Sequence, residues 1–340
     1  MAEAGFQHGS HGESTHGMQD VLLRQEIVNR RRQLVAVPDL AHREDIRGLL
    51  KEVDDALARL DGGTYGICES CHEPMEANRV LADPLARVCL GCLSDAEARA
   101  LERDLEMASA IQARLLPERM VRAGGWEIRH QYRPFGPVSG DHCDVLLPGR
   151  DGGPLHFMLG DVSGKGIPAS LLMSNLHAIL RSLVPLGLPL DTLVQQANRL
   201  FCESTLPSSF ATLVAGRLTP SGTLELVNAG HCSPLLLRGG DVSSIPTTAL
   251  PLGMFCNASA ELHRVELEPE DMVLVYTDGL SEAENAAGEP YGSERLQRLL
   301  GRLGDRSPAA AISACLEDLG AFLNGVQPGD DLTVMAIRRE

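Results

Sequence analysis

Five aspartates between residues 141 and 331 stand where a carboxylate could bind a metal ion. Asp161 and Asp278 each end an apolar run, FMLGD and VLVYTD. Asp141 follows a glycine, and the pair Asp330 and Asp331 precedes the apolar run LTVMAI. A single Asp-Gly after a strand usually forms a turn. Recurrence in four segments instead favours a site for a hard cation, which takes oxygen ligands from several segments and leaves room for water and a backbone carbonyl.

Four cysteines form a second candidate metal site. Cys68 and Cys71 make one C-x₂-C pair, and Cys89 and Cys92 make another. Two such pairs separated by a short loop place four thiolates around one ion, and this closed sulfur set selects zinc in a structural role. The alternatives are four unrelated buried cysteines and a zinc site that senses redox state; His72 is not needed as a ligand.

The other five of the nine cysteines show no pattern. They are scattered and odd in number, which favours reduced thiols over a disulfide framework. These residues are Cys143, Cys202, Cys232, Cys256 and Cys315.

Composition and charge exclude several classes of function. The formal net charge of −16 argues against nonspecific nucleic-acid binding, so we expect no direct contact with DNA. The most apolar stretch is interrupted by Asn175, His177 and Arg181 before it reaches about 20 residues, so no membrane span is predicted. The N-terminus lacks the apolar core of a signal peptide, and we expect a cytoplasmic protein.

The N-terminal part reads as a tail followed by a helical hairpin. Residues 1–17 are rich in Gly, Ser and His without periodicity, which predicts a disordered tail rather than a histidine metal site. Apolar residues recur at helical spacing over 18–60, with Pro38 in between, which predicts two antiparallel helices with a tip near 37–42. With the cysteine module, this domain covers 18–93.

Residues 94–120 predict a linker helix that Pro117 ends. Leu101, Leu105, Ala108 and Leu115 fall on one face at near-heptad spacing. This face either forms a two-stranded homodimer or packs on its own chain, and the sequence leaves both open.

Residues 121–340 alternate short apolar runs with Gly, Pro, Asp and Ser. GRLTPSGTLELV predicts a hairpin around Ser221–Gly222, and helical stretches are expected near 168–200 and 293–324. Many strands joined by short turns, with few helices, indicate an antiparallel α+β domain. The polar segment 281–292 is expected to be a flap over the site. SGKGIPASLL lacks the P-loop pattern and predicts a turn into a helix with Pro168 at its first position.

The cysteine module resembles the DksA/TraR-type zinc finger over about residues 45–93. The residues that carry this resemblance are GTYGIC (63–68), then Arg79 and Pro84 before the second cysteine pair. In that family the hairpin tip can enter RNA polymerase, where acidic tip residues matter; Asp39 and Asp45 would be those residues here.

The remainder, over nearly all of residues 105–340, resembles the SpoIIE/RsbU-type phosphatases of the PPM superfamily. The motifs stand in the family's order: MASAIQARLLP, YRPFGPVSGDHCDV, GDVSGKGIPASLLM, LELVNAGHCSPLLL, PLGM, VLVYTDGLSEAEN and GDDLTVMAIRR. The resemblance implies an α+β fold, a PPM-type antiparallel β-sandwich flanked by helices, with two Mn²⁺ or Mg²⁺ ions at one end.

Carried over, the resemblance also implies the ligands. Asp141 and Asp161 bind or bridge the metals, and the carbonyl of Val162 completes the site. Asp278 is a further metal ligand. Asp330 and Asp331 are both included among the metal ligands, and Asp330 matches the last ligand position better than its neighbour Asp331. The implied catalytic residues are Asp141, Asp161, Asp278 and Asp330, with Asp144 as a weaker candidate ligand. The chain departs from the family at Ser139, where glycine is usual, and at His142 and Cys143, where aromatic residues are usual.

The implied function is a metal-dependent protein serine/threonine phosphatase acting on an anti-anti-sigma (STAS) protein that regulates transcription. Hydroxide would attack phosphorus in line, without a covalent enzyme intermediate. His231 is either a general acid or a structural residue, and a structural role is favoured. The alternative function is a DksA-like regulator that binds RNA polymerase and uses the phosphatase domain as a scaffold.

Overall fold

The computed structural model describes residues 44–76, 79–80, 83–93, 95–147 and 153–340, and six helical positions between residues 24 and 35. The predictions for the tail at 1–17 and for the hairpin tip at 37–42 lie outside the described residues. The chain divides into two compact units, residues 1–102 and 103–340, and the division falls inside helix α4 (Asp95–Ala113).

The N-terminal unit contains helix α2 (Glu44–Asp61) running antiparallel to the described helical positions before it. Arg24 pairs with Asp61 at 2.7 Å and Arg31 pairs with Asp54 at 2.6 Å. The two segments therefore run in opposite directions. Ile27 packs with buried Val53 and Ala56 of α2. These contacts confirm the predicted direction of the hairpin. A short 3₁₀ helix, η2 (Leu90–Cys92), holds the second cysteine pair.

Two antiparallel sheets form the centre of the C-terminal unit. The six-stranded sheet has the order β1-β2-β11-β10-β7-β8, and the five-stranded sheet has the order β3-β4-β5-β6-β9. The strands of the first are β1 (Met120–Ala123), β2 (Trp126–Arg133), β11 (Leu332–Arg339), β10 (Met272–Tyr276), β7 (Leu235–Arg238) and β8 (Asp241–Ser244). Those of the second are β3 (Asp141–Leu146), β4 (Leu155–Val162), β5 (Ala211–Leu218), β6 (Thr223–Ala229) and β9 (His263–Glu266).

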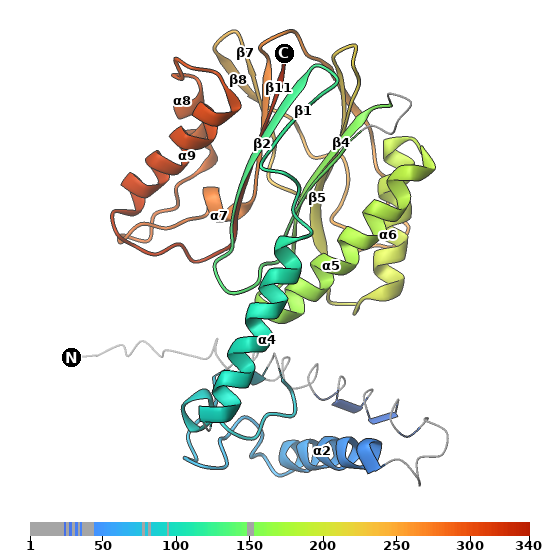
Figure 1. Cartoon of the computed structure of the whole chain (residues 1–340), viewed down its shortest axis with the longest axis vertical. Helices are drawn as coiled ribbons and strands as arrows, with labels where there is room; N and C mark the ends of the chain where they lie inside the picture. Colours follow the sequence, from blue (N-terminus) through green and yellow to red (C-terminus); the bar gives the residue numbers. More distant parts are fainter. Residues whose placement is uncertain are drawn as a thin grey trace, which may run out of the picture. The chain divides into compact units, whose positions relative to one another are not determined.

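Helices cover the outer face of each sheet (Figure 1). Helices α5 (Gly166–Leu183) and α6 (Leu190–Ser204), joined by η3 (Val184–Leu186), pack on the five-stranded sheet. Helices α8 (Ser293–Leu300) and α9 (Pro308–Leu323) pack on the six-stranded sheet, and the short α7 (Asp278–Ser281) follows β10. The four layers confirm the predicted antiparallel β-sandwich flanked by helices.

Strand alternation explains why the unit has separate cores. On β4, Phe157 and Leu159 point into the core between the sheets, whereas Met158 and Val162 point toward α5 and α6. A strand buried on both faces is expected to be continuously apolar, as the segment Phe157–Leu159 is.

One described helix, Gly166–Leu186, is long and apolar enough to cross a membrane by length and composition alone. Its buried side chains, including Met173, Leu176 and Leu180, belong to the core against the five-stranded sheet. The helix begins at Gly166, so Pro168 is its third residue and the prediction that it is the first was wrong.

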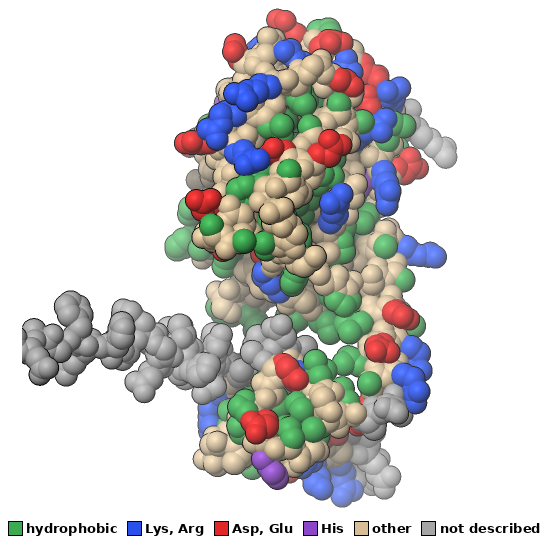
Figure 2. All heavy atoms as spheres, turned by 90° about the vertical axis from the view of Figure 1, so that its left-hand side faces the viewer, with side chains coloured by type: hydrophobic (Ala, Val, Ile, Leu, Met, Phe, Trp, Pro, Cys, Tyr) green, Lys and Arg blue, Asp and Glu red, His purple; other side chains and the backbone are tan. Residues whose placement is uncertain are grey.

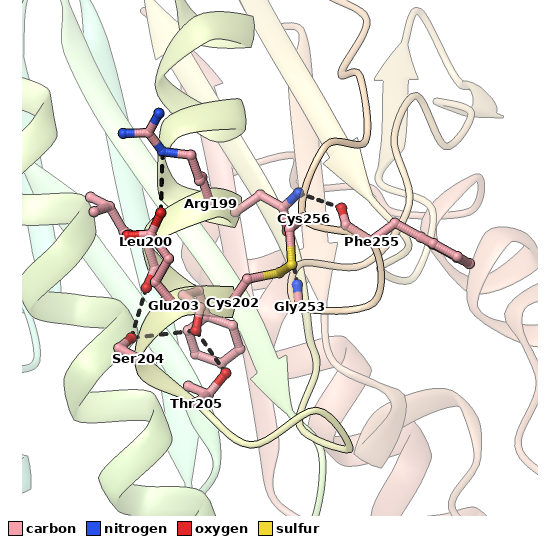
Figure 3. The surroundings of a disulfide bond; sticks show 11 residues. Arg199, Leu200, Cys202, Glu203, Ser204, Thr205, Gly253, Phe255 and Cys256 are labelled. Carbon is pink, nitrogen blue, oxygen red and sulfur yellow. Dashed lines mark hydrogen bonds and ion pairs between the residues drawn. A yellow bond between two sulfur atoms is a disulfide. The ribbon is translucent and has the colours of Figure 1, made fainter.

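The prediction that all five scattered cysteines are reduced was also wrong. Cys202 of α6 and Cys256 form a disulfide, with 5.7 Å between their Cα atoms (Figure 3). The side-chain amide of Asn198 donates to the carbonyl of Phe255 at 2.8 Å, and the amide of Gly253 donates to Asn198 at 2.8 Å. These contacts dock the 253–256 segment on α6 and bring two cysteines that lie 54 residues apart into bonding range.

The two sheets should depend on Phe157 for stability. Its side chain is fully buried, and Gly216 leaves the space beside its ring, where a Cβ would lie 2.1 Å from it. We expect Phe157→Ala to lower the free energy of unfolding by about 3–5 kcal/mol, because it leaves a cavity. Leu186→Ala, at an exposed position of η3, should change it by less than about 0.5 kcal/mol. Urea unfolding of both variants tests this; equal losses would contradict it.

Candidate metal centre

The pairing of β3 with β4 brings two of the predicted ligands together. Asp141 is the direct cross-strand partner of Asp161. Gly140 supplies the space between them, since a Cβ there would lie 3.2 Å from the carbonyl oxygen of Val162 and 3.4 Å from Oδ1 of Asp161. The carbonyl of Val162 and the carboxylate of Asp161 therefore border the same small volume.

The other sheet contributes the remaining carboxylates. Asp278 follows β10 and Asp330 precedes β11, and these antiparallel neighbours place both residues at the same edge. The two segments touch: a Cβ at Gly279 would lie 1.9 Å from the carbonyl oxygen of Asp331, so only glycine fits after Asp278. Thr277 donates its amide to the carbonyl of Thr333 at 3.0 Å and holds the segments in register.

Two threonines connect the sheets at this edge. The hydroxyls of Thr277 and Thr333 donate to Oδ2 of Asp141 at 3.1 and 2.5 Å. Oδ1 of Asp141 is buried and has no hydrogen-bond partner. A buried carboxylate oxygen without a partner is costly, and a cation would satisfy it. The sequence analysis missed both threonines, although each stands beside or close to a predicted aspartate.

Crowding and burial of these carboxylates raise their pKa values. Burial, and after it the charges of Asp278 and Asp330, raise the pKa of Asp161 to about 7. Burial and the charge of Asp161 raise the pKa of Asp141 well above its usual range. Burial and Asp330 also raise the pKa of Asp278. Each shift has the sign expected for like charges that lack a counter-ion.

The two aspartates of the final pair differ in their contacts. Asp331 is buried and accepts the amides of Phe135 at 2.7 Å and Gly140 at 2.9 Å. Its carboxylate fixes the loop before Asp141. Asp330 pairs with Lys165 at 2.9 Å and lines a cavity of about 320 Å³. Asp278, Glu282 and Glu284 also line this cavity. Asp330 is therefore the member of the pair that is open to a ligand.

Lys165 belongs to the turn that precedes α5. Its ammonium group also donates to the carbonyl of Gly329 at 2.8 Å. The flanking Gly164 and Gly166 have φ angles of +99° and +72°, which favour glycine. The turn thus places one cation beside the acidic cavity.

Two other sequence candidates do not join this group. Asp144 lies three residues after Asp141 on the same strand, so it points to the opposite face, where Arg181 binds both its oxygens at 2.8 Å. His231 is buried and its Nδ1 lies 2.7 Å from the Thr212 hydroxyl. Burial lowers the pKa of His231 to about 4, so at pH 7 the ring is neutral and is not the imidazolium that would act as a general acid.

Gln112 of α4 is a further contact that the sequence analysis missed. Its amide donates to the carbonyl of Ser139 at 2.7 Å and accepts the amide of Ser139 at 2.9 Å. Ser139 in turn accepts the amide of Asp141 through its hydroxyl at 3.0 Å. The C-terminal turn of α4 therefore holds the backbone two residues before Asp141.

The four cysteines of the N-terminal unit form a compact sulfur cluster. All four Sγ atoms lie within 4.8 Å of one another, and Cys71 and Cys89 are 3.7 Å apart. Tetrahedral zinc with bonds of about 2.3 Å requires sulfurs about 3.8 Å apart. The amides of Ser70 and Cys89 lie 3.4 and 3.3 Å from the sulfur of Cys68. Backbone hydrogen bonds lower the pKa of Cys68 to about 6, so this thiol ionises readily.

Comparison with known proteins matches the chain to two families. Residues 151–340 match the family model of stage II sporulation protein E (SpoIIE), and residues 63–98 match the prokaryotic dksA/traR C4-type zinc finger. Protein IcfG of Synechocystis sp. is 26% identical over 265 residues, covering 69% of this chain and 41% of IcfG. Phosphoserine phosphatase RsbU of Bacillus subtilis is 24% identical over 243 residues, covering 71% of each protein. The chain thus spans less than half the length of IcfG.

Among solved structures, the SiaA-PP2C domain of Pseudomonas aeruginosa superposes with a TM-score of 0.61 at 20% identity, covering 72% of this chain and 98% of that domain. This superposition shows that the chain contains a PP2C-like fold. The SpoIIE model matches more than half of the chain, and the chain belongs to the SpoIIE family, with a DksA/TraR-type zinc finger in its N-terminal unit. The predicted resemblance to both families is confirmed.

The raised pKa of Asp161 predicts how metal-free stability depends on pH. The folded chain holds a proton at Asp161 up to about pH 7, whereas the unfolded chain releases it near its ordinary value of 3.8. Acidification from pH 8 to 6 should therefore stabilise the wild type relative to Asp161→Asn, by up to about 1.4 kcal/mol per pH unit. The buried histidines lower the stability of the folded chain on acidification below about pH 6.5. The variant keeps them, so their effect cancels in the difference in stability between wild type and variant.

Calorimetric melts of both metal-free proteins at pH 8, 7 and 6 measure this. A difference between wild type and variant that does not change with pH would contradict the assignment of the shift to Asp161.

The zinc finger and the phosphatase domain have separate cores, which predicts separate responses to chelation. We expect a zinc chelator to unfold residues 64–92, since four thiols without metal do not hold a fold of this size. The C-terminal unit should stay folded because its core clusters contain none of these residues. Hydrogen exchange with mass spectrometry reports both units; loss of protection in both together would contradict the prediction.

Proposed function

We propose that the chain is a metal-dependent protein serine/threonine phosphatase that holds two Mn²⁺ or Mg²⁺ ions at the edge of its β-sandwich. The observation that carries the proposal is the convergence of Asp141, Asp161, Asp278 and Asp330 from both sheets, with Oδ1 of Asp141 buried and unpaired. Carboxylate, carbonyl and water oxygens suit Mg²⁺ and Mn²⁺, and Gly140 leaves the space that such ligands border.

Two divalent cations in such a site supply a nucleophilic water at neutral pH and polarise phosphoryl oxygens. The chain's own residues prepare for this chemistry. Asp141 and Asp161 would hold the ions from one sheet, and Asp278 and Asp330 from the other. Thr277 and Thr333 fix the rotamer of Asp141, and Asp331 fixes the loop that carries Gly140.

Lys165 is a basic side chain beside the acidic cavity. Its ammonium pairs with Asp330 at 2.9 Å. The cavity is otherwise lined by the acidic side chains of Asp278, Glu282 and Glu284, which repel a phosphate dianion. Phosphate binding therefore requires bound cations, and release of Lys165 from Asp330 would then give the phosphate one basic partner.

The substrate we propose is a phosphorylated STAS-domain anti-anti-sigma protein in a partner-switching pathway. The similar protein RsbU is named a phosphoserine phosphatase, which supports a phosphoserine or phosphothreonine side chain as the reacting group. The net charge of −16 and the acidic cavity disfavour nucleic acid as a substrate. Figure 2 shows basic and acidic side chains interspersed on the displayed face of the C-terminal unit.

We assign the zinc-finger unit and the linker helix to signal input. Gln112 of the linker helix hydrogen-bonds to the backbone of Ser139, two residues before Asp141. The face carrying Leu101, Leu105 and Ala108 is partly exposed, and dimerisation through it stays a prediction. Binding to RNA polymerase also stays a prediction, because the tip with Asp39 lies outside the described residues.

Hydrolysis of p-nitrophenyl phosphate with Mn²⁺ tests the enzyme. We expect Asp278→Asn to lower kcat at least about 100-fold, since a metal ligand acts in the transition state. The matched control is Asp241→Asn, the same change at an exposed position of β8, which should leave kcat unchanged. Equal rates in wild type and Asp278→Asn would contradict the proposal.

The substrate class is tested by incubating the full chain and Mn²⁺ with each phosphorylated STAS protein of the same genome. Release of phosphate from one of them, absent with Asp278→Asn, is expected. Turnover of p-nitrophenyl phosphate without release from any STAS protein would overturn the substrate and leave the phosphatase activity intact.

A further inference from the structure

A third cluster of metal-ligating side chains lies between β3 and α5, outside both the carboxylate site and the sulfur cluster. His142 and Asp144 are two residues apart on β3 and point to the same face, and His177 of α5 faces them. One ligand atom from each, two imidazole nitrogens and one carboxylate oxygen, lies within 4.8 Å of the others. All three side chains are buried.

His142 lacks any hydrogen-bond partner for both ring nitrogens. Its exposed fraction is 0%. Its ring centroid lies 5.4 Å from that of His177, with an angle of 53° between the ring planes. Buried polar atoms without a partner are rare in folded proteins, and each needs an explanation. A metal ion between the two rings would satisfy one nitrogen of His142.

We propose that His142, Asp144 and His177 form a second transition-metal site, which binds Zn²⁺. Two imidazoles and one carboxylate are a donor set that zinc and similar borderline cations accept, with a water completing four-coordination. Mg²⁺ and Mn²⁺ prefer oxygen ligands and should not compete well here. The set differs in chemistry from both the sulfur cluster and the carboxylate site.

Arg181 binds the carboxylate of Asp144. Its guanidinium binds both oxygens of Asp144 at 2.8 Å, and its side chain is 49% exposed. His177 Nδ1 is 3.7 Å from Oδ2 of Asp144, close enough to share one ion after a small movement. The exposed Arg181 can turn into solvent and release Asp144.

An ion in this site would join β3 to α5. His142 follows Asp141 directly, and α5 follows the turn that carries Lys165. Zinc would thus fix the position of α5 against the strand that holds a catalytic aspartate.

Zinc content of the full chain tests the proposal. The protein is dialysed against micromolar ZnCl₂ and millimolar MgCl₂, and unbound metal is removed before elemental analysis. The magnesium is added to keep zinc out of the carboxylate site. We expect His177→Gln to contain one zinc fewer per chain than wild type. His156→Gln, the same change on β4 outside the cluster, and Asp161→Asn, which disrupts the carboxylate site, should both keep the wild-type content.

Arg181→Gln provides a second measurement that does not depend on the folding of the histidine variant. It removes the competitor for Asp144, and zinc should bind roughly tenfold more tightly at this site. Equal zinc content in wild type and His177→Gln would overturn the proposal. If His177→Gln does not fold, unchanged zinc affinity in Arg181→Gln would overturn it.

Discussion

Mutual repulsion of carboxylates at one edge of the β-sandwich is the constraint on which the rest of the site depends. Asp141 is completely buried beside Asp161, and the pKa values of Asp141, Asp161 and Asp278 are all raised. Two threonine hydroxyls and the ammonium of Lys165 offset only part of this cost. Bound divalent cations would therefore stabilise this cluster by neutralising the remaining repulsion between its carboxylates.

The site exists only when the two sheets are packed. Asp141 and Asp161 lie on one sheet, and Asp278 and Asp330 lie next to strands of the other, so neither sheet alone carries all four carboxylates. Gly140 and Gly279 permit this close approach, since a side chain at either would meet a ligand atom or the backbone beside it. Metal binding should therefore report on sandwich packing, and contacts such as those of Gln112 can act on the site from outside.

The sequence predicts the strands and the zinc site well because their signals are local. Apolar runs end at Asp161 and Asp278, and two C-x₂-C pairs need no knowledge of the fold. That Asp144 points away from Asp141 could also have been predicted, because residues three apart on a strand face opposite sides of the sheet. The Cys202–Cys256 disulfide and the threonine clamp on Asp141 could not be predicted, because they depend on contacts between segments 54 to 192 residues apart. The different tasks of Asp330 and Asp331 likewise depend on which backbone amides the loop presents.

Whether the four carboxylates bind two cations can be measured in crystals of the full chain soaked in MnCl₂, through anomalous scattering at the manganese edge. We expect two peaks between the carboxylates of Asp141, Asp161, Asp278 and Asp330, with Asp331 still accepting the amide of Gly140. Side chains pointing apart with no manganese between them would contradict it.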